Sequence, residues 1–248
     1  MVLTGKIAIV TGGGGGFGEG IARAYAEQGA KVAVLDFNAE AAARVAREIG
    51  PNAIAVQADV GVRGDVYRAV ADIISALGTP DILVNNAGTT HLNGSMLDVD
   101  EETFDRVFRV NVKSIYLFAQ ALVPAMRERG GLILNIGSVS AIRPRPGLTW
   151  YNGSKGAVTL ITKSMAVELA PAKIRVNVLC PVMAATGLLE SFMGKPDTPE
   201  NRKLFVPTIP MGRFCEASDV AAAAVFLASD AAAFITGVEL PIDGGRSV

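Results

Sequence analysis

The chain has 248 residues, of which 50% are hydrophobic and 19% charged, with a formal net charge of −1. This composition is typical of a folded chain with a large core and excludes extensive disorder. No Lys/Arg run and no apolar stretch of about 18 residues occurs, so we expect no nucleic-acid partner and no membrane span. Two distant cysteines, Cys180 and Cys215, and a single histidine favour a reducing, cytoplasmic location without a metal site.

Short apolar runs alternate with longer helical patterns along the chain. We predict strands over residues 7–10, 31–35, 53–57, 82–84, 132–136, 175–179 and 238–242. We predict helices over residues 17–28, 39–49, 62–77, 101–129 (one bent helix or two consecutive ones), 150–169 and 218–229. This alternation predicts an α/β protein: a single Rossmann-type domain over residues 1–248, whose doubly wound parallel sheet of about seven strands has helices on both faces.

A glycine-rich turn follows the first predicted strand and opens the next helix. It reads Gly12 to Gly16, followed by Phe17 and Gly18. Such a turn lets the backbone approach a pyrophosphate, which then binds the amides of the helix N-terminus. The G-x-G-x-x-G spacing is weak evidence in a run of five glycines, and a purely structural turn is the alternative.

Two acids end or follow the next strands. Asp36 closes the second strand, where a carboxylate can bind both hydroxyls of the adenosine ribose. It would repel a 2′-phosphate, and no Arg or Lys lies in the glycine turn or directly after Asp36, so we expect NAD rather than NADP. A helix-start role is the alternative. Asp59 could bind the adenine amino group or cap the next helix.

The run from Asn85 to Gly88, after the fourth predicted strand, suits the cofactor crevice or a simple turn.

Tyr151 and Lys155 lie four residues apart, so on a helix their side chains share one face. Free Tyr titrates near ~10, and a unit charge about 4 Å away is worth roughly 4 kcal/mol at an effective dielectric of about 20. We therefore expect Lys155 to lower the pKa of Tyr151 by up to about three units, toward the range of acid–base catalysis. A chance Y-x-x-x-K spacing on a helix is the alternative.

Taken together, these motifs resemble the short-chain dehydrogenase/reductase family over the whole chain, in its branch of about this length. The family's motifs fall, in order, on Thr11, Gly12, Gly16 and Gly18, on Asn85 to Gly88, on Asn111, on Ser138, on Tyr151 and Lys155, and on Ile242 to Gly245. Within the family the chain is similar to 3-oxoacyl-[acyl-carrier-protein] reductases and to glucose and polyol dehydrogenases. A Val at position 182, where the family has Gly after Pro181, leaves the local chain path and the role of Thr186 open.

The resemblance implies NAD-dependent interconversion of a secondary alcohol and a ketone by hydride transfer. It implies that Tyr151 is the general acid/base, that Lys155 assists it and holds the nicotinamide ribose, that Ser138 binds the substrate oxygen, and that Asn111 holds a water leading to solvent. A cofactor half of about residues 1–135 would precede a catalytic and substrate-loop half of about 136–248. The implied cofactor contacts are Gly12, Gly16, Phe17, Gly18, Asp36, Phe37, Asp59, Val60, Asn86, Ala87, Gly88, Tyr151, Lys155, Pro181, Val182 and Thr186.

Other candidate side chains keep two interpretations. Ser140 is a rival to Ser138, although only Ser138 has the family's spacing to Tyr151. Arg143 and Arg145 could bind an acidic substrate group or be solvated. His91 could line the substrate pocket or lie on the surface, and Cys180 could be a reactive thiol or a small buried residue. Residues 184–213 lack periodicity and suggest a binding loop or a variable surface loop, with an apolar wall of Met183, Leu188, Leu189, Phe192 and Met193.

The substrate class stays open at this level. A 3-oxoacyl thioester, a sugar or polyol and a small secondary alcohol are all compatible with the same chemistry. A non-catalytic NAD(H) sensor is an alternative of another class, and an epimerase or dehydratase would need a further substrate domain. The resemblance also implies a homotetramer packed through the two long helices around the fifth strand, where the Ala-rich stretch 157–166 permits close approach.

Overall fold

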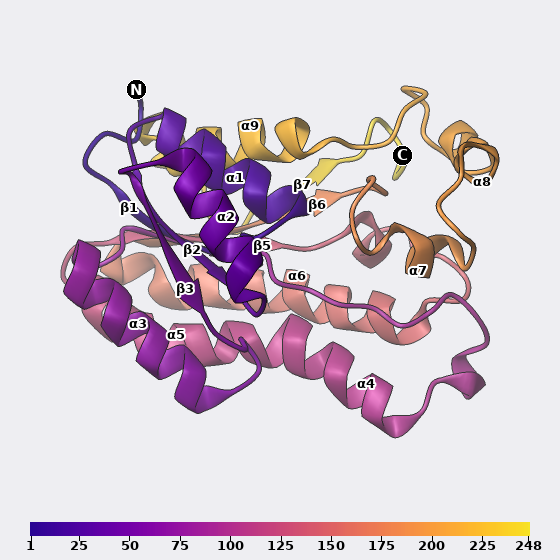
Figure 1. The fold of residues 1–248 in the computed structure, drawn as a ribbon, viewed down its shortest axis with the longest axis horizontal. Helices are drawn as coiled ribbons and strands as arrows, with labels where there is room; N and C mark the ends of the chain where they lie inside the picture. The colour runs from indigo at the N-terminus through magenta and orange to yellow at the C-terminus, as the bar shows by residue number, and fades with distance from the viewer.

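The computed structural model describes residues 1–248, and seven parallel strands form its single sheet, in the order β3-β2-β1-β4-β5-β6-β7 (Figure 1). The strands are β1 (Ile7–Thr11), β2 (Lys31–Asp36), β3 (Ala53–Gln57), β4 (Ile82–Asn85), β5 (Gly131–Ile136), β6 (Ile174–Pro181) and β7 (Glu239–Ile242). The strand order runs outward from β1 in both directions. The crevice of such a sheet opens between β1 and β4, beyond their carboxyl ends. The predicted doubly wound Rossmann sheet is therefore confirmed.

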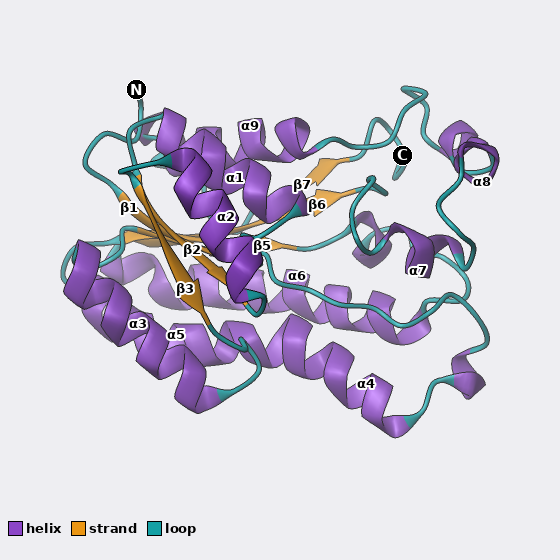
Figure 2. Cartoon of the chain, in the orientation of Figure 1, coloured by secondary structure: helices purple, strands orange, loops and turns teal.

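Helices cover both faces of the sheet (Figure 2). One face carries α1 (Gly16–Glu27), α2 (Ala39–Ile49) and α9 (Ala217–Ala228). The other carries α3 (Arg63–Leu77), α4 (Glu101–Phe108), α5 (Ser114–Met126) and α6 (Thr149–Leu169). Two short helices, α7 (Leu189–Met193) and α8 (Pro199–Lys203), lie in the long loop after β6. Single 3₁₀ turns occur at Met96–Asp98, Val139–Ala141, Ala170–Ala172, Val206–Thr208 and Asp230–Ala232.

The sheet separates two hydrophobic cores. Ala8 and Val10 of β1 pack into the core beneath α1, α2 and α9, whereas Ile9 between them enters the core beneath α3, α5 and α6. Successive side chains of a strand point to opposite faces, so a strand buried on both sides must be apolar at every position. This is why the strands were visible in the sequence as continuous apolar runs.

Most predicted bounds agree with the structure to within about two residues, and Asn38 caps α2 by accepting hydrogen bonds from the amides of Glu40 (3.0 Å) and Ala41 (3.1 Å). The prediction that residues 184–213 are irregular was wrong, because α7, α8 and a 3₁₀ turn lie there. Helices of five residues are too short to show a periodic pattern. Residues 101–126 form α4 and α5 in succession, joined by a π-turn at Arg109–Lys113.

Candidate active site

A cavity of about 920 Å³ lies along the carboxyl ends of the strands. Residues at or just after the ends of six strands line it: Gly12, Asp36, Ala58, Asn86, Gly137 and Val182. Because parallel strands all end at the same edge of the sheet, segments distant in the sequence meet in this one hollow. Every proposed cofactor contact lines the cavity except Gly18, and of the proposed catalytic residues only Asn111 does not.

The glycine turn presents backbone amides to the cavity. Gly15 is the N-cap of α1, no side chain caps the first turn, and a Cβ on Gly15 would meet open space. Gly16 has a φ of +54°, a conformation that side chains disfavour. An anionic pyrophosphate fits such an exposed helix N-terminus. Gly18 lies beneath the turn instead: a Cβ there would come within 2.1 Å of the Gly12 carbonyl oxygen, so Gly18 permits close packing of turn and helix.

Asp36 both lines the cavity and braces the glycine turn. Its carboxylate accepts hydrogen bonds from the amides of Gly14 and Asn38, each at 2.9 Å. Arg44, which local sequence reasoning missed, donates to the Gly14 carbonyl at 3.0 Å. This guanidinium is paired with Glu19 at 2.7 Å and with Glu48, so it is already neutralised beside the turn.

Hydrogen bonds tie the end of β4 to the end of β1. The Asn86 side chain donates to the carbonyl of Thr11 at 2.8 Å, and the Thr11 hydroxyl accepts from the amides of Asn86 and Ala87 at 3.0 Å. Asp59 accepts from the Gly61 amide at 2.8 Å and is ion-paired with Arg109 at 3.2 Å. It lines the cavity and is not the N-cap of α3.

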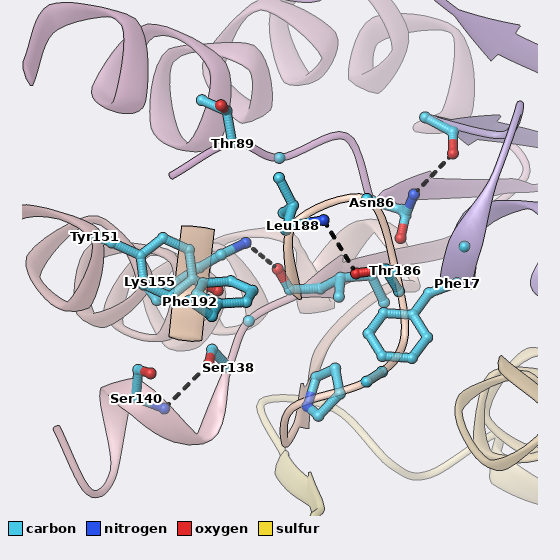
Figure 3. Close-up of a pocket in the computed structure, with 18 of the residues that line it drawn as sticks. Phe17, Asn86, Thr89, Ser138, Ser140, Tyr151, Lys155, Thr186, Leu188 and Phe192 are labelled. Atoms are coloured by element: carbon cyan, nitrogen blue, oxygen red, sulfur yellow. Dashed lines mark hydrogen bonds between the residues drawn. The ribbon is translucent and has the colours of Figure 1, made fainter. Parts of the chain in front are cut away.

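Tyr151, Lys155 and Ser138 converge on the cavity from α6 and the end of β5 (Figure 3). All three side chains are more than nine-tenths buried. The Lys155 ammonium donates to the Ile136 carbonyl at 2.8 Å and lies 5.9 Å from the centre of the Tyr151 ring. The Ser138 hydroxyl accepts from the Ser140 amide at 3.1 Å, and both serines line the cavity.

The predicted direction of the Tyr151 pKa shift was wrong. Burial raises the pKa of Tyr151 to about 12, and the hydrogen bond with Ser138 opposes this only in part. Burial also lowers the pKa of Lys155 to about 8. Desolvation disfavours the charged form of both groups. The helix does place the two residues on one face, but residue spacing does not show how deeply that face is buried.

Asn111 lies in the π-turn behind the cavity wall. Its amide oxygen accepts from the Thr89 amide at 2.8 Å, and its amide nitrogen donates to the Thr89 carbonyl and the Ser154 hydroxyl, both at 2.9 Å. A Cβ on Gly88 would lie 3.4 Å from the Asn111 oxygen and 3.5 Å from the Lys155 nitrogen, so both side chains approach the same backbone. Asn111 thus fixes Thr89, a cavity-lining residue that the sequence did not suggest.

Known proteins share this whole architecture. Residues 12–247 match a model of the short-chain dehydrogenase/reductase family whose description is Enoyl-(Acyl carrier protein) reductase. The chain belongs to the short-chain dehydrogenase/reductase family. A 4-formylbenzenesulfonate dehydrogenase of Comamonas testosteroni is 49% identical to this chain, and the match covers 100% of both chains.

Two solved structures are similar to this short-chain dehydrogenase/reductase. A 3-ketoacyl-(acyl-carrier-protein) reductase from Brucella melitensis, complexed with NADH, superposes with a TM-score of 0.95 at 48% identity, covering 99% of this chain and 100% of that one. A short-chain type dehydrogenase/reductase from Mycobacterium marinum gives a TM-score of 0.91 at 37% identity, covering 99% and 96%. The protein is therefore an oxidoreductase that acts on CH–OH donors with a nicotinamide cofactor.

The segment after β6 follows the cavity in this short-chain dehydrogenase/reductase. Val182 has no positive φ and its amide donates to the Ile242 carbonyl at 3.1 Å, so a side chain is tolerated where the family has Gly. Pro181, Val182 and Thr186 all line the cavity. A Cβ on Gly16 would lie 3.3 Å from the Thr186 methyl group, which places Thr186 against the glycine turn.

Only some of the side chains that we expected at the substrate pocket line the cavity. Met183, Leu188 and Phe192 line the cavity, whereas Leu189 and Met193 are buried away from it. His91 is neither at the surface nor in the cavity: it is buried, with Nδ1 2.9 Å from the Leu92 carbonyl oxygen.

Cys180 is a small buried residue, and burial raises the pKa of its thiol to about 11. Arg143 and Arg145 both line the cavity. Sequence reasoning missed further lining residues from the loop after β4, from α4 and the π-turn, from the long loop after β6 and from the C-terminus: Thr89, Arg106, Arg109, Leu204, Phe205, Thr208 and Arg246. None of the helices combines the length and the apolar composition that a membrane-spanning helix needs.

Proposed function

We propose that this protein interconverts a secondary alcohol and a ketone with NAD(H), using Tyr151 as the general acid/base. The observation that carries the proposal is the meeting of Tyr151, Ser138 and Lys155 in the cavity that also contains the open glycine turn. We further propose one functional domain, in which about residues 1–135 hold the dinucleotide and about residues 136–248 hold the substrate.

Each side chain has a distinct task in this proposal. The Tyr151 hydroxyl gives its proton to the substrate oxygen during reduction and takes it back during oxidation. The Ser138 hydroxyl holds that oxygen against the phenol, and the Lys155 ammonium stabilises the phenolate. Asn111 fixes the wall beside Lys155 and binds a water that leads the proton to solvent. A bound nicotinamide supplies or accepts the hydride.

The pKa values of Tyr151 and Lys155 bear on whether ketone reduction or alcohol oxidation is favoured at neutral pH. A phenol whose pKa is raised to about 12 is protonated at neutral pH and ready to donate. A lysine whose pKa is lowered to about 8 is still mostly protonated there, so its charge is available when a phenolate forms. This state favours Tyr151 as the acid of ketone reduction, and oxidation should need a higher pH.

Two features support the choice of NAD over NADP. Asp36 lines the cavity beyond the glycine turn, where its charge opposes a 2′-phosphate. The guanidinium of Arg44, which donates to the Gly14 carbonyl of the glycine turn, is occupied by Glu19 and Glu48. The adenosine end would also contact Phe37, Asp59 and Val60, which line the same cavity.

Asp36→Ala is expected to lower the ratio of kcat/KM with NAD to kcat/KM with NADP by at least about ten-fold, since a close like-charge pair costs several times RT. Asp36 also braces the glycine turn, so activity with both cofactors should fall somewhat, and the ratio separates the two effects. Asp81→Ala, which removes a carboxylate on the amino-end side of β4 that accepts from the Ile7 amide at 2.9 Å, is the matched control. An unchanged ratio in Asp36→Ala would mean that the carboxylate only braces the turn.

Relatives suggest two substrate types for the test of this function. One relative's name specifies a compound with a formyl and a sulfonate group, and one solved relative is named for a 3-ketoacyl thioester on a carrier protein. We would follow NADH oxidation with a panel of ketones, aldehydes, sugars and 3-oxoacyl thioesters, repeated with NADPH. A complete lack of turnover with normal NADH binding would favour a non-catalytic NAD(H) sensor.

We also propose a homotetramer. A second hollow of about 850 Å³ lies between α5 and α6 and is lined by apolar side chains such as Ile115, Val123 and Met165. Leu160 and Val167 of α6 are 66% and 80% exposed, which a partner helix would cover. Light scattering should give four times the mass of the chain, whereas a monomeric mass would contradict the proposal.

A further inference from the structure

Four arginines line the cavity without a carboxylate partner: Arg106, Arg143, Arg145 and Arg246. None of them takes part in an ion pair, although most ion pairs of the protein involve arginine. Arg109, which lines the same cavity, is instead neutralised by Asp59 at 3.2 Å. Arg106 donates to the Thr89 hydroxyl at 3.2 Å. Arg143 and Arg145 both lie near Arg246, and these three form a region of uncompensated positive charge, called the arginine cluster below.

The arginine cluster adjoins the reacting end of the cavity. Arg143 follows the 3₁₀ turn that begins directly after Ser138, and its guanidinium donates to the Arg246 carbonyl at 2.8 Å. The Arg145 carbonyl accepts from the side chain of Asn152 at 2.9 Å, and Asn152 is the neighbour of Tyr151 on α6. The only acids lining the cavity, Asp36 and Asp59, end or follow β2 and β3. The cluster thus belongs to the substrate end.

Arg145 is held in place before any ligand binds. Its guanidinium carbon lies 4.5 Å from the centre of the Phe205 ring, a cation–π contact that restrains the side chain. It is half-buried, and burial together with the nearby charge of Arg246 lowers the pKa of Arg145. Keeping an unpaired, partly desolvated cation beside a second one costs folding free energy. An anionic ligand would offset that cost.

We propose that the substrate carries a carboxylate or sulfonate group that binds the arginine cluster while its hydroxyl or carbonyl carbon lies at Ser138 and Tyr151. This inference rests on the proposed function and adds the class of substrate. A guanidinium fork binds a planar or tetrahedral oxyanion with two parallel hydrogen bonds. Phe192, whose ring centre is 5.0 Å from that of Tyr151, and Phe205 provide apolar contacts for the part of the substrate between its two ends.

Matched pairs of ketones test this inference. We would compare 4-acetylbenzoate with 4-acetylbenzamide, and 6-oxoheptanoate with 6-oxoheptanamide, so that each pair differs in charge but hardly in shape. The wild-type kcat/KM is expected to favour the acid of at least one pair by at least about ten-fold, the contribution of one charge-assisted hydrogen bond. Arg145→Met should abolish that preference while changing kcat/KM for the amide by less than about three-fold, and Arg145→Lys should retain part of it.

Arg202→Met is the matched control, because Arg202 belongs to the long loop that carries Phe205 but is paired with Asp197 and does not line the cavity. Its acid-to-amide ratio should equal that of the wild type. Calorimetric titration of 4-acetylbenzoate into the enzyme–NADH complex provides a readout without turnover, and Arg145→Met should weaken that binding at least about ten-fold.

The outcomes separate the two proposals. Turnover of acids and amides at equal kcat/KM would overturn the anionic substrate while leaving the proposed function intact. Loss of all turnover, with Arg145-dependent binding of 4-acetylbenzoate preserved, would overturn the proposed function alone. If Arg145→Met reduced turnover only of 3-oxoacyl groups on a carrier protein and not of the free acids, the cluster would serve a protein surface and the inference would be wrong.

Discussion

Tyr151→Phe is expected to lower kcat by at least about a thousand-fold and to leave the Kd for NADH within about two-fold. A positioned general acid contributes roughly 10²–10⁴-fold, and no second phenol lines the cavity to replace it. Phe retains the ring that packs edge-on against Phe192, so the fold and the cavity wall should be unaffected. Stopped-flow or steady-state oxidation of NADH measures kcat, and fluorescence titration measures the Kd.

Tyr25→Phe is the matched control for this prediction. Tyr25 is fully buried in the core beneath α1, α2 and α9 and does not line the cavity. Its hydroxyl donates to the Ala224 carbonyl at 3.2 Å. Its loss should cost stability of the order of one hydrogen bond, about 1 kcal/mol, with kcat unchanged. A Tyr151→Phe variant that kept more than about a tenth of wild-type kcat would transfer the acid/base role to another group.

Lys155→Met is expected to reduce kcat by at least about a hundred-fold and to alter how stability depends on pH. The folded pKa of Lys155, about 8, lies below its ordinary value of 10.5. Between these values the unfolded chain binds more protons than the folded one, so the wild-type free energy of unfolding rises with pH across this window. Lys155→Met lacks this rise. Its stability relative to wild type should therefore fall by up to about 2 kcal/mol between pH 7 and pH 9.5.

Urea denaturation at the two pH values measures this difference, and the window ends before unfolded tyrosines ionise near ~10. Lys163→Met is the control: Lys163 lies on the same helix but is exposed, and its ammonium pairs with Glu239 at 2.8 Å. We expect no comparable change between the two pH values in that variant. A parallel pH dependence of wild type and Lys155→Met would show that the ammonium is better solvated than its burial indicates.

The raised pKa of Tyr151 changes the interpretation of the Tyr151–Lys155 pair. An ammonium near a phenol was expected to lower the phenol's pKa, but at 5.9 Å from the ring centre it does not overcome the burial of both groups. A high phenol pKa suits proton donation at neutral pH and should make the oxidative rate increase with pH. The sign of the shift depends on the solvent exposure of α6, which no local spacing encodes.

The sequence by itself predicted the helices and strands of this protein and the residues that we propose for its dinucleotide end. The strands were visible because a sheet covered on both faces needs continuous apolar runs, and Tyr151 and Lys155 were paired because helical spacing is a local property. The glycine turn and Asp36 could be proposed as cofactor contacts because their proposed roles depend on adjacent backbone. Short helices α7 and α8 were missed, since five residues carry no usable period.

Only the tertiary structure decided the rest. The position of Asn111 behind Thr89 depends on a π-turn, and the arginine cluster joins residues 143 and 145 to residue 246. Stacking of Phe205 on Arg145 joins the long loop to the segment before α6. Burial, pKa shifts and uncompensated charge arise from contacts between residues far apart in the chain. Sequence spacing therefore predicted the chemistry of the site, whereas the three-dimensional packing determined its electrostatics and the class of substrate that we propose.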